Sequence, residues 1–200
     1  YQVSDANDLN ALIEKASVIV IGPGLGQTNW AKQLLLHVLK TDHPKVLDAD
    51  ALNLIAKDPS VTSLSGSIIT PHPGEASRLL DCTTLEIQKN RYAKLHEIIK
   101  KYETVVALKG AGTLIGQESD LVSVCGAGNP GMASAGMGDV LTGVIAGLLA
   151  QGLDLYQATQ IGVVVHSTAA DQAAEQGGER GLLATDLLDG IRELVNNDEK

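Results

Sequence analysis

Short runs of apolar residues, each followed by a loop and then by a helix-like pattern, recur along this sequence of 200 residues. The runs cover residues 17–21, 44–48, 67–70 and 104–108. Their apolar residues are mostly continuous rather than alternating, which is typical of strands buried on both faces of a parallel sheet. The segments between them would supply helices for both faces of the sheet. The pattern predicts a three-layer α/β/α fold with a mostly parallel central sheet.

The composition favours one domain with an aliphatic core. Hydrophobic residues make up 44% of the chain, yet it has no Phe, one Trp and four Tyr. A chain of this length can bury one sizeable core, so residues 1–200 are interpreted as a single domain. The net charge of −9 argues against a general nucleic-acid or anionic-membrane surface, because such partners need clustered Lys and Arg.

Two further observations bear on the cellular setting. The longest apolar run, at about residues 140–150, is too short to span a membrane and is interrupted by glycines. Cys82 and Cys125 are isolated and form no CxxC pair, which favours a reduced, cytoplasmic setting over a disulfide-bonded one. We therefore expect no membrane partner and no disulfide.

The most glycine-rich stretch runs from residue 126 to residue 139 and leads directly into an apolar helix predicted from residue 140. A helix start offers unpaired backbone N–H groups and the positive end of the helix dipole, so it suits an anion such as phosphate. Gly136 and Gly138 would let a ligand approach the backbone closely. Asp139 lies at the junction, where it could be a catalytic carboxylate or only the N-cap of the helix.

The predicted helix also carries a strip of small residues on one side. The strip consists of Gly143, Ala146, Gly147 and Ala150. Because each helical Gly costs about 1 kcal/mol relative to Ala, we expect the strip to pack closely against another backbone.

Three other glycine-containing or polar loops follow predicted strands. Residues 22–26 read GPGLG, which lacks the GxGxxG spacing, so a tight turn explains them as well as a ligand loop does. Residues 71–75 read PHPGE, whose prolines fix the backbone around His72, a residue that could contact substrate or be structural. Residues 109–113 read KGAGT, but no GxxxxGK[ST] phosphate loop occurs anywhere. Because such loops share one rim of a parallel sheet, we expect all four to converge on one ligand.

The remaining elements are predicted from periodicity and capping signals. Asp48 and Asp50 follow a strand, where they could lie near a metal-bound phosphate or cap the next helix. Thr83 and Glu86 have capping-box spacing and open a helix predicted to reach Tyr102, with Leu85 on its buried side. Further helices are predicted at 7–15, 29–40, 51–58, 154–176 and 185–195, with an antiparallel hairpin at 114–124 and a polar tail at 196–200.

Five motifs in this order resemble the ADP/ATP-dependent NAD(P)H-hydrate dehydratases, a family of the ribokinase-like superfamily. The motifs are VIGPGLG at 20–26, DADALN at 48–53, TPHPGE at 70–75, KGAGT at 109–113 and GMASAGMGDVLTG at 131–143. The resemblance extends from about Val18 to the final helix. Because the family domain is longer at its amino end, we expect residues 1–200 to be an N-terminally truncated fragment of it.

The resemblance implies a ribokinase-like fold and a repair reaction on hydrated NADH or NADPH, called (S)-NADHX and NADPHX. ADP or ATP, with Mg²⁺, phosphorylates the hydroxyl on the reduced nicotinamide ring, and phosphate then leaves to restore NADH or NADPH. Hydroxide leaves poorly and phosphate leaves well, which explains why a kinase fold can carry out a dehydration.

The resemblance also implies roles for individual residues, with Asp139 as the catalytic base and a substrate contact. The other substrate contacts are Gly24, Gly26 and His72. The backbone N–H groups of Gly136, Met137 and Gly138 form an anion hole. The nucleotide is held by Lys109, Gly110, Ala111, Gly112, Thr113, Asn129 and Gly138, and no residue is assigned as a metal ligand. The chain departs from the family pattern at Ala135 and Met137, where Gly and Ser or Thr are usual, so a hydroxyl contact to phosphate would be lost.

Two other functions stay open at this point. The first is a ribokinase-like kinase of a small hydroxylated vitamin precursor, although the loop at 71–75 resembles the dehydratase version. The second is a nucleotide-binding sensor without turnover. The small-residue helices would also allow close packing in a homo-oligomer, and the resemblance allows an epimerase domain elsewhere in a full-length chain.

Overall fold

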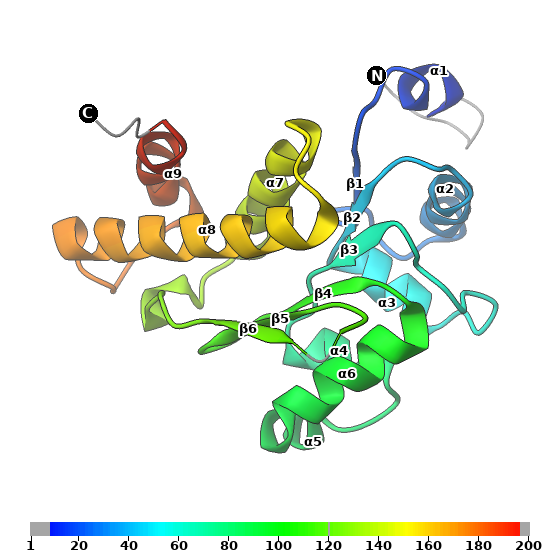
Figure 1. Ribbon diagram of the computed structural model, residues 1–200, viewed down its shortest axis with the longest axis horizontal. Helices are drawn as coiled ribbons and strands as arrows, with labels where there is room; N and C mark the ends of the chain where they lie inside the picture. Colours follow the sequence, from blue (N-terminus) through cyan, green and yellow to red (C-terminus); the bar gives the residue numbers. More distant parts are fainter. Residues whose placement is uncertain (1–8, 120, 197–200) are drawn as a thin grey trace.

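The computed structural model describes residues 9–119 and 121–196, which contain a six-stranded sheet (Figure 1). The strands follow one another across the sheet in chain order. They are β1 (Ile19–Ile21), β2 (Lys45–Leu47), β3 (Ser67–Ile69), β4 (Val105–Leu108), β5 (Thr113–Gly116) and β6 (Val122–Cys125). Strands β1 to β4 are parallel, whereas β5 and β6 form an antiparallel hairpin at the edge. The predicted mostly parallel sheet and the predicted hairpin are both confirmed.

Helices cover the two faces of the sheet and complete the predicted three layers. The first group is α2 (Asn29–Leu39), α3 (Asp50–Ala56), α4 (Pro73–Leu79), α5 (Thr84–Lys89) and α6 (Arg91–Tyr102). The second is α7 (Met137–Ala150), α8 (Leu155–Gly177) and α9 (Leu187–Val195), and Figure 1 shows it on the opposite side of the sheet. Shorter elements are α1 (Asn10–Ile13) and the 3₁₀ turns Pro130–Met132 and Ala184–Asp186.

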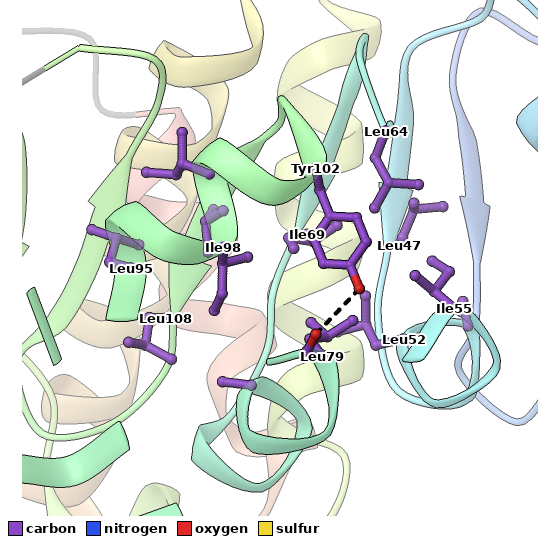
Figure 2. Close-up of a cluster of buried hydrophobic side chains, with 14 of the residues drawn as sticks. Leu47, Leu52, Ile55, Leu64, Ile69, Leu79, Leu95, Ile98, Tyr102 and Leu108 are labelled. Atoms are coloured by element: carbon purple, nitrogen blue, oxygen red, sulfur yellow. Dashed lines mark hydrogen bonds between the residues drawn. The ribbon is translucent and has the colours of Figure 1, made fainter. Parts of the chain in front are cut away.

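Adjacent residues of one strand enter different cores, as two-sided burial requires. Leu47, on β2, packs with the first group of helices, whereas Val46 packs with α7 and α8. The core on the first side is almost wholly aliphatic, and Figure 2 shows Tyr102 as its aromatic member. The buried Tyr102 hydroxyl donates a hydrogen bond to the Leu79 carbonyl oxygen at 3.3 Å, which satisfies a polar group inside an apolar layer.

Strand β1 departs from the expected two-sided burial. It has one hydrogen-bonded neighbour, β2, and its Val20 side chain is 43% exposed. None of the three residues of β1 is fully buried, so the prediction of a strand buried on both faces is wrong here.

Several helix boundaries differ from the predictions because turn geometry overrides periodicity. The helix predicted from Thr83 to Tyr102 is two helices, since Asn90 leaves helical geometry at φ −145° and ψ 47°. The Thr83 capping box is confirmed, but Leu85 is 62% exposed and not part of the core. Helix α4 was missed because its N-cap is His72, which is not a usual capping residue, and because Gly74 in its first turn is typical of loops.

The predictions for the first and last helices also need correction. The helix predicted at 7–15 is shorter in the structure, at Asn10–Ile13, and residues 7 and 8 lie outside the described residues. The last helix begins at Leu187 rather than at Thr185, which lies in a 3₁₀ turn and does not cap it. Residues 197–200 of the predicted polar tail are outside the described residues. None of the described helices is long and apolar enough to cross a membrane.

Helix α7 begins three residues earlier than predicted, which changes the interpretation of Asp139. The N-cap position is Gly136, at φ 87°, so Asp139 is the third residue of the helix and is not its N-cap. The strip of small residues does not pack as expected, because a Cβ added at Gly143 or Gly147 would have no atom of residues 9–119 or 121–196 within 4 Å. The close approach comes instead from Gly162 of α8, where a Cβ would lie 2.6 Å from Ile145 Cγ1.

Candidate functional site

The loop at residues 22–26 is fixed by the strand next to it. A Cβ on Gly22, at φ 131°, would lie 1.8 Å from the Asp48 carbonyl oxygen, so only glycine fits there. The Gly26 N–H donates to Asp50 Oδ2 at 2.9 Å. Asp50 is the first residue of α3 rather than its cap, so its carboxylate holds this loop and the capping alternative is wrong. At Gly24 and Gly26 an added Cβ would meet no atom of the described residues within 4 Å.

A buried carboxylate lies at the end of β2 and joins three elements. Asp48 is 1% exposed, and its Oδ1 accepts a hydrogen bond from Lys109 Nζ at 2.9 Å. Its Oδ2 accepts one from Thr142 Oγ1, on α7, at 3.1 Å. A buried carboxylate is costly unless it is paired, and here the cation and the hydroxyl satisfy it. Asp48 therefore orients Lys109 instead of capping a helix, an arrangement that residues 61 positions apart do not reveal in the sequence.

Lys109 also lies close to α4 and to the start of α7. Its Nζ is 3.9 Å from Oε2 of Glu75, on α4. A Cβ on Gly138 would lie 3.1 Å from Lys109 Nζ and 3.2 Å from Asp48 Oδ2, so glycine allows the ammonium to reach the first turn of α7. The Lys109 ammonium thus lies beside the positive end of the α7 helix dipole, and the two together favour the binding of an anion.

His72 has a structural role that the sequence left open. It is the N-cap of α4, and its Nδ1 accepts a hydrogen bond from the Gly74 N–H at 3.0 Å. Its Nε2 lies 3.4 Å from Glu75 Oε1, and the backbone N–H of His72 donates to Glu75 Oε2 at 2.8 Å. The side chain is half exposed. Because both ring nitrogens already have internal partners, contact of His72 with substrate stays a prediction.

A cavity of about 530 Å³ lies between the β4–β5 loop, the stretch after β6, the start of α7 and the inner face of α8. Of the predicted site residues it brings together Lys109, Gly110, Ala111, Gly112, Thr113, Asn129, Met137 and Gly138. Gly24, Gly26, His72, Gly136 and Asp139 are not among its lining residues. Two of the four predicted loops therefore line this cavity. Asp139 is exposed and follows the cavity residue Gly138 directly, so the carboxylate belongs to the same helix start.

The stretch that forms the far wall of the cavity is held by α8. The Asn129 side-chain amide donates to Asp171 Oδ1 at 2.9 Å and to the Ala170 carbonyl at 3.1 Å. Its Oδ1 accepts from the Gly131 N–H at 3.0 Å, and Asp171 Oδ2 accepts from the Gly128 N–H at 2.8 Å. The polar atoms of Asn129 thus shape the wall, and direct binding of a ligand by this side chain stays a prediction.

No side chain in the described part of the chain caps the backbone donors at the start of α7. The first N–H groups of a helix have no acceptor within the helix, and here they lie beside Lys109. The Met137 side chain is 5% exposed and packs with Ala169, Ala170 and Leu187 in a third core cluster. The side chain that replaces a hydroxyl of the family pattern therefore points into an apolar core, and the backbone N–H groups of the predicted anion hole do not depend on it.

Sequence reasoning missed His166, which also lines the cavity. The residue is 4% exposed, and its Nε2 has no hydrogen-bond partner among the described residues. Burial lowers its pKa to about 4, the charge of Lys109 acts in the same direction, and a hydrogen bond to the Met137 backbone acts against both. The imidazole is therefore neutral at neutral pH. A lone histidine in an apolar helix gave no signal of this role.

Three comparisons relate this geometry to known proteins. The sequence model of the NAD(P)H-hydrate dehydratase family matches residues 1–193. The bifunctional NAD(P)H-hydrate repair enzyme of Coxiella burnetii is 58% identical over 196 residues, which are 98% of this chain and 40% of that protein. The chain thus spans well under half the length of that relative.

Solved structures agree with the fold. The structure of an ADP/ATP-dependent NAD(P)H-hydrate dehydratase from Bacillus subtilis, co-crystallised with ATP/Mg²⁺, has a TM-score of 0.79 and 34% identity. The match covers 90% of this chain and 64% of that chain. A ribokinase-like superfamily protein from Enterococcus faecalis has a TM-score of 0.81 and 30% identity, over 94% of this chain and 64% of that chain. The predicted ribokinase-like fold is confirmed.

Proposed function

Because the chain belongs to the NAD(P)H-hydrate dehydratase family, we propose that it binds ADP or ATP and uses it to dehydrate (S)-NADHX and NADPHX. One observation carries the proposal. One cavity is lined by the loop at 109–113, the stretch at 126–133 and the first turn of α7, and in that turn the exposed Asp139 directly follows the lining residue Gly138. An anion-binding helix start next to an exposed carboxylate is what a phosphoryl transfer to a hydroxyl requires.

The residues divide the work in a simple way. The nucleotide occupies the cavity with its phosphates toward the start of α7, where backbone N–H groups and the Lys109 ammonium stabilise the charge on the transferring group. Asp139 accepts the proton of the ring hydroxyl, whose oxygen then bonds to the terminal phosphorus while the bond to the nucleotide's leaving oxygen breaks. Asp48 keeps Lys109 in this position through the hydrogen bond described above.

The second stage removes the new phosphate. The bond between the ring carbon and the phosphate oxygen breaks, and its electron pair leaves with the phosphate. A neighbouring ring carbon gives its proton to water or to the departing phosphate, and the electrons of that C–H bond restore the double bond of NADH or NADPH. The N–H groups of α7 and Lys109 stabilise the departing phosphate as they stabilised the transferring one. One nucleotide is consumed for each hydrate repaired.

Magnesium fits this site as an ion that arrives with the nucleotide. Within the ranges described, no three His, Cys, Asp or Glu side chains are grouped to hold a metal. Mg²⁺ at nucleotide sites is typically held by phosphates and water with few protein ligands, and it would neutralise part of the phosphate charge. The B. subtilis relative was crystallised with ATP/Mg²⁺, which supports the same arrangement here.

An assay with hydrated NADH tests the proposal. We expect NADH absorbance to return when the chain is mixed with NADHX and ADP or ATP, and not when either is omitted. Nucleotide consumption without restored NADH would favour the kinase of a vitamin precursor, and nucleotide binding without turnover would favour the sensor. Neither alternative has an observation of its own in this structure.

The wider setting of the protein is also a proposal. A second activity in the same polypeptide is supported by the bifunctional name of the C. burnetii relative, of which the chain spans 40%. That this activity is an epimerase stays a prediction from the resemblance. A homo-oligomer and a cytoplasmic location stay predictions from the sequence. Size-exclusion chromatography with light scattering would test the first of these.

A further inference from the structure

Arg91, the first residue of α6, contacts the loop that joins β4 to β5. Its Nη1 donates to the Ala111 carbonyl at 2.6 Å, and its Nη2 donates to the Leu108 carbonyl at 3.0 Å. A Cβ on Gly110 would lie 3.2 Å from Nη2, so the guanidinium lies against the glycine backbone between those two carbonyls. The planar side chain thus holds both ends of the loop at once.

Ion pairing does not explain why an arginine is found there. None of the ion pairs among the described residues involves Arg91. Its Nε is buried and has no partner in the described part of the chain. Burying part of a cation that has only carbonyl oxygens as partners costs free energy. The hydrogen bonds to the loop are therefore the contacts that offset this cost.

The contact with Ala111 determines where one N–H group of the loop points, that of Gly112. The C=O and N–H of a trans peptide point in opposite directions, so holding the Ala111 carbonyl turns the Gly112 N–H away from the guanidinium. Gly110, Ala111 and Gly112 line the cavity, and their N–H groups have no acceptor within residues 9–119 and 121–196. Successive free N–H groups in such a turn form a concavity that binds anions. A cation on the carbonyl side also polarises the peptide and strengthens its N–H as a donor.

We propose that Arg91 is a positioning residue of the nucleotide site, which acts through the peptide between Ala111 and Gly112 and sets the Gly112 N–H for the nucleotide phosphates. The inference rests on the proposed function only in that it requires an adenine nucleotide in the cavity. Arg91 itself is not a lining residue of the cavity and acts from behind the loop.

Affinity for ADP, measured by titration calorimetry on the full chain, tests the proposal. Replacing Arg91→Met removes both hydrogen bonds, and we expect ADP to bind about tenfold more weakly or worse. Arg91→Lys keeps the charge but cannot hold two carbonyls, so its affinity for ADP should lie between those of the wild type and Arg91→Met. Lys89→Met is the matched control, because it removes the same charge at an exposed residue two positions earlier in the chain.

The outcomes separate positioning from a general structural role. In turnover, positioning predicts a higher KM for the nucleotide with an unchanged KM for the hydrate, and faster amide exchange confined to residues 108–116. ADP affinities of Arg91→Met and Lys89→Met that agree within twofold would overturn the proposal. If Arg91→Met does not fold, wild-type affinity in Arg91→Lys would overturn it equally.

The same titrations keep this inference apart from the dehydratase proposal. A wild-type chain that binds ADP but does not restore NADH would refute the dehydratase activity and leave the role of Arg91 standing. A wild-type chain that binds no adenine nucleotide would overturn both.

Discussion

The chemistry of the site depends on single residues whose partners are distant in the sequence. Lys109 reaches the start of α7 because Asp48, at the end of another strand, accepts its hydrogen bond in a buried setting. Asp139 differs from both, since it is exposed and lies in the first turn of a helix. A base must exchange protons with its substrate, and an exposed carboxylate without an ion-pair partner among the described residues can do so.

Replacing Asp139→Asn should remove the base and preserve nucleotide binding. We expect kcat to fall by about 10²- to 10⁴-fold, which is the usual contribution of general base catalysis. The affinity for ADP should change little, because the cavity lining does not include Asp139. Steady-state kinetics together with calorimetry measure the two effects separately. A variant with wild-type kcat would refute the assignment of the base.

Two substitutions of His72 separate its capping role from the predicted contact with substrate. His72→Ala removes the N-cap of α4 and should lower the free energy of unfolding by about 1 kcal/mol, whereas His72→Asn keeps a capping side chain and should lower it less. If the ring also contacts the hydrate, both variants should raise KM for the hydrate with little effect on ADP binding. Denaturant unfolding and steady-state kinetics measure these effects. An unchanged KM in both variants would leave His72 with its capping role alone.

What could be predicted at this scale followed from local signals. The loops at 109–113 and 126–139 were found because glycines and a helix start are visible in a short window, and the cavity contains residues of both. The Asp48 to Lys109 pair was missed because its members are 61 residues apart, and only the parallel sheet brings their strand ends together. His166 was missed because nothing around it differs from an ordinary apolar helix.

At the scale of elements, buried strands were predicted well and helix starts less well. A strand covered on both faces is mostly apolar, so β2, β3 and β4 left a clear pattern although Lys45 begins β2 and Ser67 begins β3. Helix starts depend on backbone geometry at one or two residues. Pro at the first position and Glu75 three residues after His72 were signals for α4, although histidine is not a usual cap. The break at Asn90 has neither Gly nor Pro to mark it.

The packing of α7 against α8 predicts opposite effects for two glycines. Gly162→Ala should destabilise the protein by about 1–3 kcal/mol, because the new Cβ would overlap Ile145 on α7. Gly147→Ala is the matched control on the open side of α7, where helix propensity should stabilise the protein by up to about 1 kcal/mol. Urea unfolding of the two variants measures both effects. Equal destabilisation by both would contradict the close approach of the helices at Gly162.

At the scale of the whole molecule, two cores on opposite faces of one sheet hold the rim loops in place, and a third cluster joins α8 and α9 near the start of α7. His166 belongs to this last region and connects the stability of the molecule to pH. Its pKa is lowered to about 4 in the folded protein, chiefly by burial, whereas an unfolded histidine has a pKa near 6.5.

This difference predicts a loss of stability in mild acid. Above about pH 6.5 His166 is neutral in both states and contributes nothing, but as the pH falls toward 4 the unfolded state binds a proton that the folded state excludes. A shift of this size corresponds to about 3 kcal/mol of unfolding free energy lost across that window. The lowered pKa values of Asp58 and Glu86 act in a different window, because carboxylate stability is lost only below their unfolded pKa values, near 4.

Unfolding free energies measured between pH 7 and pH 4.5 test this prediction. His166→Gln cannot titrate, so its stability should fall much less across this range than that of the wild type, even if it is less stable at pH 7. His96→Gln, on α6, is the control for the loss of a histidine outside the cavity, and it should keep the wild-type slope because it leaves His166 in place. Parallel curves for His166→Gln and the wild type would mean that His166 takes up its proton in the folded state as readily as in the unfolded one. In that case the region around the start of α7 must open to water in mild acid.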